Sequence, residues 1–215
     1  SLTADMREQC FFLLYGKGRN GKSTLLDIVG RVLGDYAHVA AFSTFEQAQP
    51  GAPSYDLASL DGMRLVAAAE GSGKWLHSSR LKDVTGGEKV NARHPYGRPF
   101  EFRPACKIWL STNELPRVAD ESEGMWRRIR QIPFTQHFEG PTDNRDLKDE
   151  LLLEAPGILA WLVAGCLYWQ SHGLTTPGAV SEATATYRAD SDPLARFIDE
   201  TCEFVENSEI QTSEL

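Results

Sequence analysis

Apolar and polar residues alternate in blocks along the first two thirds of the chain, a pattern that predicts strands separated by helices. Apolar-rich runs typical of buried strands occupy residues 10–14 (CFFLL), 63–69 (MRLVAAA), 107–111 (KIWLS) and 129–134 (IRQIPF). After the first run, residues 23–33 (STLLDIVGRVL) carry apolar side chains at helical spacing, and a glycine follows them as at many helix ends. Strands alternating with helices predict an α/β fold with a three-layer, mostly parallel sheet.

Shorter elements complete the predicted core. We expect a short helix before the first strand, a loop over residues 43–58, and a helix over residues 78–84. Residues 89–103 have a strand–turn–strand pattern, with the turn near a Pro-Tyr-Gly sequence at residues 95–97. Together with the four longer strands, these elements assign residues 1–138 to one core.

The chain becomes helical from residue 144 onward, so residues 139–215 are assigned to a helical subdomain packed on the core. Its most apolar run, residues 157–169 (GILAWLVAGCLYW), is predicted to be a buried helix, because a membrane span needs roughly 18 apolar residues and this run is shorter. Asp192 followed by Pro193 is a typical helix start and predicts a last helix to about residue 205.

Composition narrows the class of protein without naming its chemistry. With 215 residues, of which 41% are hydrophobic and 24% charged, the chain has enough apolar material for one compact domain. Its four cysteines stand far apart and form no CxxC pair, which argues against a zinc site or a disulfide framework and favours a reducing, cytoplasmic setting. We expect no membrane partner, and we expect the chain to be a fragment of a longer protein because it opens without methionine.

Charge is distributed unevenly along the chain, whose net charge is −8. Residues 139–215 hold 15 acidic and 4 basic residues, a net charge of −11, whereas residues 1–138 hold 15 acidic and 18 basic residues, a net charge of +3. Residues 64–108 alone carry 9 basic and 4 acidic residues, a net charge of +5. A local basic surface is enough to contact a phosphate backbone, so the overall negative charge does not exclude nucleic acid as a partner.

A glycine-rich segment directly follows the first predicted strand. Residues 16–24 read GKGRNGKST and match the P-loop pattern GxxxxGK[ST] through Gly16, Gly21, Lys22 and Ser23. The glycines let backbone N–H groups surround a β-phosphate, aided by the positive end of the following helix. The lysine would neutralise phosphate charge and the serine hydroxyl would ligate Mg²⁺, so we expect ATP and Mg²⁺ here. The candidate nucleotide-binding residues are Gly16, Gly18, Asn20, Gly21, Lys22, Ser23 and Thr24.

Two polar residues at predicted strand ends are candidates for chemistry at the γ-phosphate. Glu70 follows the strand at residues 63–69, where a carboxylate could hold Mg²⁺ through water or polarise the attacking water. Ala69 precedes it, so this one carboxylate could serve both tasks. Asn113 ends the strand that begins at Lys107, where a neutral amide could position a water; the alternative is an asparagine favoured only by the turn.

Arg127 and Arg128 lie in the run WRRIRQIPF and are candidates for an arginine finger. Such a side chain reaches the γ-phosphate held by a neighbouring subunit and stabilises its developing charge. The alternative is a pair of ordinary arginines flanking a strand. The sequence does not choose between the two residues.

The predicted hairpin (KVNARHPYGRPFEFR) interleaves basic and aromatic side chains. Lys89, Arg93, His94 and Arg98 could contact nucleic-acid phosphates, and Tyr96 could stack on a base. The alternative is a solvated edge hairpin whose charges prevent strand-to-strand aggregation.

Taken together, these segments resemble one family, the superfamily 3 helicases, which are AAA+-like P-loop NTPases of viruses, phages and plasmids. Within it they look most like the phage and plasmid primase-helicases related to the poxvirus primase-helicase. The resemblance covers residues 10–138 and is carried by GKGRNGKSTLLDIVGRVLGDYA, by RLVAAAEGSGKWLHSSRLKDVTGGEKVNARHPYGRPFEFRPACKIWLSTNELP and by WRRIRQIPF.

The resemblance implies hexameric rings that bind ATP between subunits and translocate along DNA, separating its strands. It implies that Glu70 is the Walker B acidic residue, Asn113 the motif C sensor, Arg127 or Arg128 the trans-acting finger, and residues 89–103 the pore hairpin. It further implies an upstream primase module in the same polypeptide and a phage- or plasmid-encoded protein in a bacterial host. The chain end resembles the lead-in to a truncated winged-helix region.

Two other functions are open at this stage. A nucleotide-gated DNA loader or packaging ATPase would grip DNA without unwinding it, and strand displacement on a forked duplex would separate it from a helicase. A P-loop kinase for a small molecule would need a substrate pocket and lid arginines near the glycine-rich segment. The run of strands through Asn113 and the paired arginines disfavour that kinase.

Overall fold

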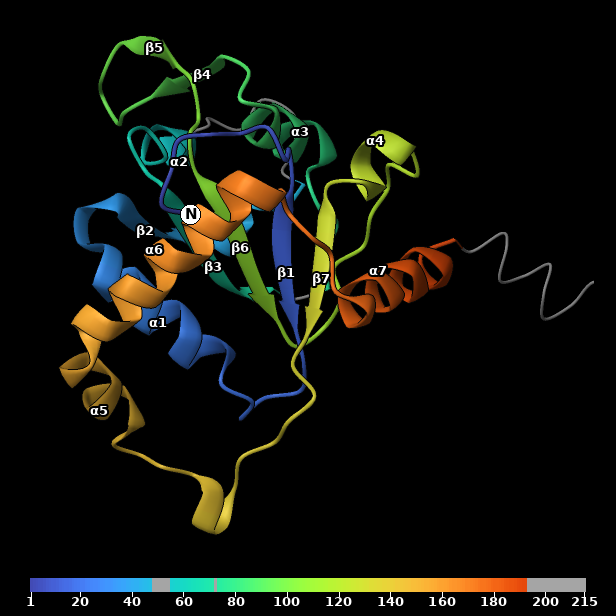
Figure 1. Ribbon diagram of the computed structural model, residues 1–215. Coiled ribbons are helices and arrows are strands. Elements are labelled where there is room, and N and C mark those ends of the chain that lie inside the picture. Colours follow the sequence, from blue (N-terminus) through green and yellow to red (C-terminus); the bar gives the residue numbers. More distant parts are fainter. Residues whose placement is uncertain (48–54, 72, 193–215) are drawn as a thin grey trace, which may run out of the picture.

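Five parallel strands form the sheet on which the rest of the chain is arranged, in the order β2-β3-β6-β1-β7 (Figure 1). The computed structural model describes residues 1–47, 55–71 and 73–192. The strands are β1 (Phe11–Tyr15), β2 (Ala37–Ala41), β3 (Leu65–Gly71), β6 (Lys107–Thr112) and β7 (Ile129–Pro133). The prediction of a mostly parallel α/β sheet is therefore confirmed.

The central strand β1 pairs with β6 on one side and with β7 on the other. Its alternate residues face opposite layers. Phe12 and Leu14 pack toward α1 (Lys22–Leu33), whereas Phe11 and Leu13 belong to the larger core on the other face. Because both faces of the sheet are covered, the inner strands β1 and β3 are almost entirely apolar, as in most parallel sheets.

The larger core lies on the face opposite α1. There α3 (Ser78–Gly86), α4 (Glu123–Trp126), the short helix α2 (Tyr55–Ala58) and the 3₁₀ turn η2 (Phe42–Phe45) supply most of the apolar partners of the strands. The predicted helix over residues 78–84 is thus confirmed, with two further residues at its end.

The predicted hairpin is confirmed as β4 (Val90–Arg93) and β5 (Pro99–Phe102), an antiparallel pair separate from the main sheet. Tyr96 has a φ of 60° at the tip, a left-handed conformation that the turn requires. In Figure 1 the hairpin lies at the top of the molecule, whereas the strands of the main sheet point toward the bottom. It therefore lies at the amino ends of those strands.

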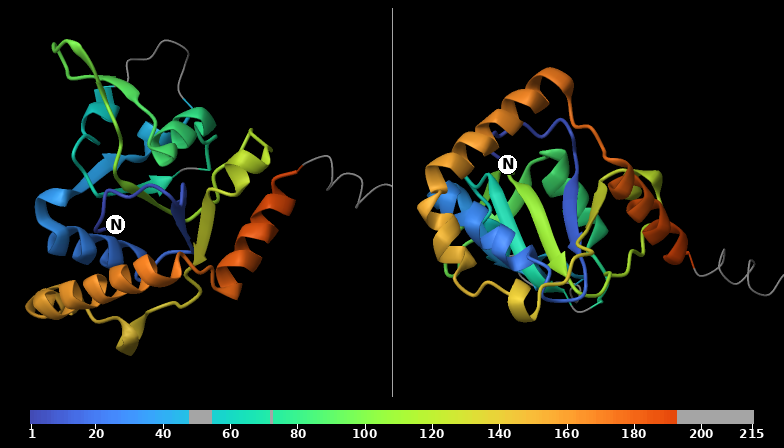
Figure 2. Two further views of the ribbon diagram at one scale, coloured as in Figure 1. Left: turned by 45° about the horizontal axis from the view of Figure 1, so that its top comes forward. Right: turned by 60° about the horizontal axis from the view of Figure 1, so that its bottom comes forward.

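Three helices follow β7 and lie on two sides of the sheet. After the 3₁₀ turn η3 (Gly140–Thr142), α5 (Leu147–Leu153) and α6 (Ala155–His172) pack beside α1, and α7 (Gly178–Asp190) packs along the edge strand β7 (Figure 2). On α6, the indole Nε1 of Trp169 donates to Glu8 at 2.7 Å. The residues assigned to a helical subdomain thus extend over one face and one edge of the sheet.

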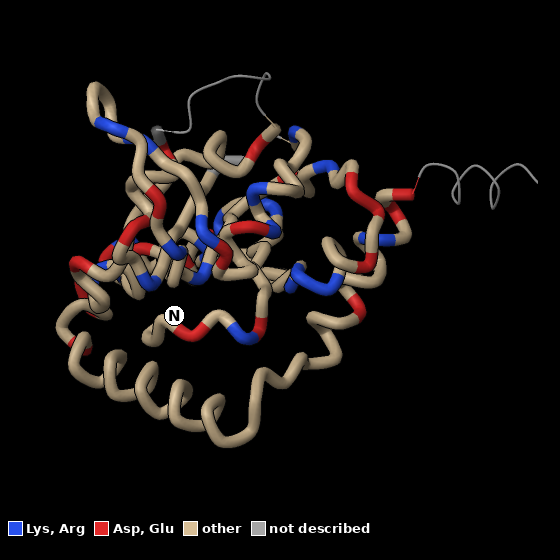
Figure 3. The backbone as a smooth tube through the Cα atoms, turned by 90° about the horizontal axis from the view of Figure 1, so that it is seen from above, with Lys and Arg blue, Asp and Glu red and all other residues tan. Residues whose placement is uncertain are grey.

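Residues 157–169 form a helix as expected, but the expectation that this helix is buried is wrong. The helix exists as α6, but none of its residues is buried, and Trp161 is 68% exposed and Leu167 60% exposed. Figure 3 shows that α6 contains no Lys, Arg, Asp or Glu residue. A helix that is apolar on every side is usually enclosed. Here only the side toward α1 meets apolar partners within the described part of the chain.

No single helix among the described residues is long and apolar enough to cross a membrane. The pair Gly140–Leu153 and Ala155–His172 meets the length and composition criteria only when taken together, and it bends by 77° at the break.

The structure also differs from the sequence expectations before β1 and at β2. The short helix before β1 is wrong, because the Asp5 carboxylate accepts from the backbone N–H of Arg7 at 2.9 Å and forms a turn there. Strand β2 was not predicted, since its sequence AHVAA has one β-branched residue and no clear alternation. The predicted helix from Asp192 to about residue 205 lies outside the described residues.

Helix α7 completes the hydrogen bonding of the sheet edge. The Thr184 hydroxyl accepts from the backbone N–H of Gln131 in β7 at 3.1 Å and donates to the Val180 carbonyl at 2.7 Å. Tyr187 is buried, donates its hydroxyl to the Pro116 carbonyl and packs edge-on against Trp126 at 5.2 Å between ring centroids. Burial raises the pKa of the Tyr187 phenol. The edge strand is therefore covered by a helix and not left open for pairing.

We predict that Thr184→Val destabilises the protein by about 1 kcal/mol, because the isosteric valine leaves the Gln131 N–H without its acceptor. Thermal or urea unfolding measures the effect. The control is Thr186→Val, the same change at an exposed position of α7, which should leave stability nearly unchanged. Equal stability of the two variants would show that α7 does not complete the sheet edge.

Candidate phosphate-binding site

The loop between β1 and α1, residues 16–21, is named the glycine-rich loop below. Gly18 has a φ of 38°, Arg19 of 47° and Gly21 of 85°, so the chain turns tightly through left-handed conformations. Gly21 is the N-cap of α1, whose first N–H groups have no partners inside the helix. The loop therefore presents backbone donors at the positive end of a helix, which is an arrangement that binds anions.

The ammonium of Lys22 is buried at the centre of this loop, with the residue only 4% exposed. It donates to three acceptors: the Gly16 carbonyl, the side-chain oxygen of Asn20 at 3.0 Å and that of Asn113 at 3.1 Å. Burial lowers the pKa of this lysine. A buried cation needs such acceptors, because leaving its donors unpaired lowers the stability of the protein by about 2 kcal/mol or more.

Asn113 brings the end of β6 to the loop. Its side-chain oxygen accepts from Lys22 and also from the backbone N–H of Gly18 at 3.3 Å. These two donors are of the kind that bind phosphate oxygens in glycine-rich loops. The side-chain oxygen of Asn113 thus occupies a position suited to an anionic oxygen, and a bound phosphate would compete with it for both donors.

Asn20 ties the loop to the chain that follows β7. It is buried, and its amide nitrogen donates to the Phe134 carbonyl at 3.2 Å while its oxygen accepts from Lys22. A Cβ on Gly16 would lie 2.3 Å from both the Asn20 amide and the Phe134 carbonyl. Only glycine fits at residue 16, because this contact leaves no room for a side chain.

A cavity of about 280 Å³ opens beside the loop at the carboxyl ends of β3 and β6. It is lined by residues 18–24, Ala69 and residues 111–113. Ser23 is exposed in this lining and Thr24 is half-buried. Six of the seven candidate nucleotide-binding residues thus line this cavity, all except Gly16, together with Asn113, which lies 91 residues from Lys22 in the sequence.

Glu70 lies at the end of β3, next to the cavity lining. The pairing of β3 with β6 shifts in register between Ala69 and Gly71, so that Glu70 occupies an irregular position in the strand. The backbone of Glu70 is therefore close to Ser111 and Thr112, which pair with its two neighbours. The side chain of Glu70 lies outside the described residues.

Arg127 and Arg128 lie at the amino end of β7, away from the glycine-rich loop, which follows the carboxyl end of β1. Arg128 is buried and donates to the Thr85 hydroxyl at 3.2 Å and to the Gly124 carbonyl. Its pKa is lowered by burial and, secondarily, by Arg127. Arg127 is exposed and donates to Gln9 at 3.0 Å. Neither arginine lines the cavity of its own chain.

The candidate nucleic-acid residues are all exposed on the β4–β5 hairpin or beside it. Tyr96 is fully exposed at the tip. Arg93 donates to the Gly97 carbonyl at 2.9 Å and so stabilises the turn, and Lys89 pairs with Glu101 at 3.1 Å. His94 stacks on Phe100. The hairpin and the glycine-rich loop lie at opposite ends of the sheet (Figure 1).

Two features outside the glycine-rich loop concern metal ions and a second cavity. Among the side chains that the structure describes, no group of three or more His, Cys, Asp or Glu residues is placed to hold a metal ion. A larger cavity of about 470 Å³ lies beneath α6 and is lined mainly by apolar and aromatic side chains, including Phe12 and Trp161. It shares no residue with the cavity beside the loop and offers no cluster of phosphate-binding donors.

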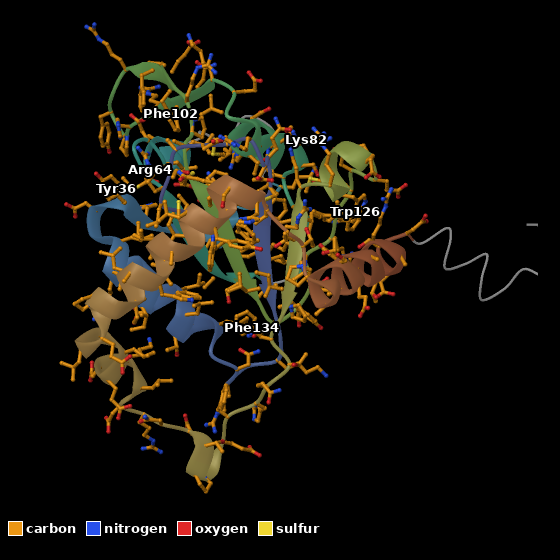
Figure 4. All side chains as sticks on the ribbon, in the orientation of Figure 1. Tyr36, Arg64, Lys82, Phe102, Trp126 and Phe134 are labelled. Carbon is orange, nitrogen blue, oxygen red and sulfur yellow. The ribbon has the colours of Figure 1, made fainter. Side chains whose placement is uncertain are left out.

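The role of Phe134 in the loop was not predicted from the sequence. The contact uses its backbone carbonyl, which any residue would provide, and joins positions 114 residues apart. Figure 4 places the Phe134 side chain at the lower end of the sheet, where β7 ends.

The chain is similar to viral proteins that are named as putative helicases and primases. The chain is 29% identical over 227 residues to a putative helicase of Acanthamoeba polyphaga mimivirus, covering 96% of this chain and 24% of that relative. It is 29% identical over 208 residues to a putative helicase of Frog virus 3, which covers 86% of this chain and 21% of that relative. It is 25% identical over 220 residues to a putative primase of African swine fever virus, which covers 91% of this chain and 22% of that relative. The chain spans less than a quarter of the length of these curated relatives.

A solved structure, the apo form of the NrS-1 C-terminal region, has the same fold. It superposes with a TM-score of 0.57 at 17% identity, over 92% of this chain and 43% of that one. A family model covers residues 14–128, more than half of the chain, from the end of β1 to the start of β7. The chain therefore belongs to the family that this model describes, the family of unknown function DUF5906.

Proposed function

We propose that this chain is the ATP-hydrolysing motor of a primase-helicase-type replication protein and that it uses ATP to translocate along DNA. The observation that carries the proposal is the convergence of Lys22, the Gly18 N–H and the Asn113 side chain on one cavity at the start of α1. The relatives named as helicases and primases support the replication context.

The sheet topology supports a ligand at this place. The chain passes from β1 to the far edge strand β2, returns through β3 and β6, and then crosses to β7 on the other side of β1. The strand order therefore reverses at β1. In open parallel sheets, ligands bind outside the carboxyl ends of the strands at such a switch point, which is where the glycine-rich loop lies.

In this proposal each group of the loop has one task toward a triphosphate. The backbone N–H groups at the start of α1 bind the β-phosphate, and the Lys22 ammonium neutralises charge on the β- and γ-phosphates. The γ-phosphate oxygens accept hydrogen bonds from the Gly18 N–H and the Lys22 ammonium, and these bonds replace the ones that both groups donate to the Asn113 oxygen. The released Asn113 side chain can then orient the attacking water. Transfer of the γ-phosphoryl group to that water leaves ADP and inorganic phosphate.

The site also suits Mg²⁺, which proteins usually bind through one or two carboxylates together with substrate phosphates and water. The exposed Ser23 hydroxyl and Glu70 would hold the ion, which would neutralise charge on the phosphates. Glu70 is also the proposed acceptor of the proton from the attacking water.

Of the two arginines, Arg127 is the better candidate for a finger that acts on a neighbouring subunit in a ring. It is exposed and has a partner, Gln9, on the protein surface, whereas Arg128 is buried on Thr85 and Gly124. A finger must be free to reach another molecule, and removing Arg128 from its buried acceptors would cost stability.

The first prediction concerns Lys22. Lys22→Ala should lower the ATPase rate about 100-fold or more, because the substitution removes a charged donor from the developing phosphate charge. Lys17→Ala is the matched control, since Lys17 is exposed in the same loop and does not line the cavity. Phosphate release under saturating ATP measures both variants. Full turnover by Lys22→Ala would refute the site assignment.

The second prediction separates the arginines. Arg127→Ala should fold with nearly unchanged stability, as exposed substitutions usually do, and should lose ATPase activity in the assembled protein. Mixing it with inactive Lys22→Ala subunits should restore part of the activity, because some interfaces then combine one intact lysine with one intact arginine.

Arg128→Ala should instead lower stability by about 1–3 kcal/mol, since it leaves buried acceptors unpaired. Unfolding curves of both variants test this difference. The assignment would be reversed if Arg127→Ala hydrolysed ATP at the normal rate and Arg128→Ala folded normally but did not hydrolyse ATP.

The third prediction concerns DNA. Tyr96→Ala combined with Arg98→Ala should weaken single-strand binding about tenfold or more, since stacking and phosphate contacts are lost, while the basal ATPase rate is retained. The control Arg145→Ala removes the same charge two residues before α5, and Figure 1 shows α5 at the opposite end of the molecule from the hairpin.

Fluorescence anisotropy with a labelled oligonucleotide measures binding in the DNA experiment. Equal affinity of the double variant and the control would remove the hairpin from the DNA path. ATPase activity without strand displacement by the full-length protein would favour a loader over a helicase.

A further inference from the structure

The segment after β7, residues 134–139, follows the glycine-rich loop along its outer side. The Phe134 N–H donates to the Tyr15 carbonyl at 2.7 Å and its carbonyl accepts from Asn20. Four residues later, the Phe138 N–H donates to the Arg19 carbonyl at 2.8 Å. Two separate attachments therefore fix this segment against the loop.

Phe138 is the single apolar residue in an otherwise polar and exposed stretch, residues 135–139 (TQHFE). Phe138 is 43% exposed, and its Cε2 atom lies 4.0 Å from the position that a Cβ on Gly21 would occupy. Isolated exposed aromatic residues are common and need no special explanation. This one differs in its place, because its backbone is bonded to the loop and its ring lies against the N-cap of α1.

The proposed triphosphate orientation, on which this inference rests, directs the nucleoside toward Phe138. Glu70 and Asn113, the candidates for γ-phosphate chemistry, lie at the ends of β3 and β6 on one side of β1. The segment after β7 lies on the other side of β1. A triphosphate with its γ end at β3 and β6 and its middle at Lys22 leaves the nucleoside on the β7 side.

We propose that Phe138 is the stacking platform for the nucleobase of the bound nucleotide. An aromatic ring can stack on the π-face of any base and contributes about tenfold or more to affinity. Stacking alone does not read the edge of a base, so the platform does not by itself distinguish ATP from other nucleoside triphosphates. It makes no contact with phosphate, and its contribution is therefore confined to ligands that carry a base.

The test compares ATP with inorganic tripolyphosphate, a ligand that has the phosphates and no base, using Phe138→Ala and calorimetry in the presence of Mg²⁺. We expect Phe138→Ala to raise the Kd for ATP about tenfold and to leave the Kd for tripolyphosphate unchanged. The KM for ATP should rise in parallel while kcat changes little. Phe138→Trp should restore affinity.

Two variants control this experiment. Tyr168→Ala removes an aromatic ring of similar exposure from α6 and should leave ATP binding unchanged. Phe138→Leu keeps apolar volume but lacks a π-face and should resemble the alanine variant, so it carries the test if alanine perturbs the loop. Equal ATP affinity of wild type, Phe138→Ala and Phe138→Leu would overturn the proposal.

The same measurements separate this inference from the proposed function. Lys22→Ala should weaken the binding of both ATP and tripolyphosphate. If Lys22→Ala weakens the binding of both ligands and the Phe138 variants weaken the binding of neither, the phosphate site is supported and the stacking role of Phe138 is refuted. If wild-type protein binds neither ligand, or Lys22→Ala has no effect, the proposed function itself fails.

Discussion

The buried ammonium of Lys22 is the interaction on which the arrangement of the site depends. A cation with almost no exposure must be surrounded by acceptors, and here they come from the glycine-rich loop itself and from the end of β6. One of them, Asn20, is in turn held by the carbonyl that follows β7. Satisfying one charge therefore aligns the ends of three neighbouring strands, β6, β1 and β7, around one cavity.

In the proposed function, the same contacts would make the site respond to a phosphate ligand. The Asn113 oxygen has two donors in the absence of a phosphate, the Gly18 N–H and the Lys22 ammonium. An anion that replaces it must supply better acceptors, and phosphate oxygens do so because hydrogen bonds between charged groups are the strongest. Binding and repositioning of Asn113 are thus expected to occur together, which couples the end of β6 to occupancy of the loop.

Much of the fold could be predicted from the sequence, because its signals are local. The β1–loop–α1 unit is encoded by an apolar run, a glycine motif and a helical repeat within about two dozen residues, and the hairpin by its turn. What could not be predicted depends on distant partners. The burial of Arg128 requires Thr85, 43 residues away, and the exposure of α6 reflects which elements pack on it and not its own composition. The same limit holds for the Asn20–Phe134 bond, because no pattern indicates which carbonyl an amide will find.

The most direct test of the account is the structure of the protein with Mg²⁺ and a nonhydrolysable ATP analogue. The account predicts the β- and γ-phosphates against the glycine-rich loop, with the Lys22 ammonium bonded to phosphate oxygens and no longer to Asn113. A nucleotide bound elsewhere, for example in the apolar cavity beneath α6, with the bond between Lys22 and Asn113 intact, would contradict it.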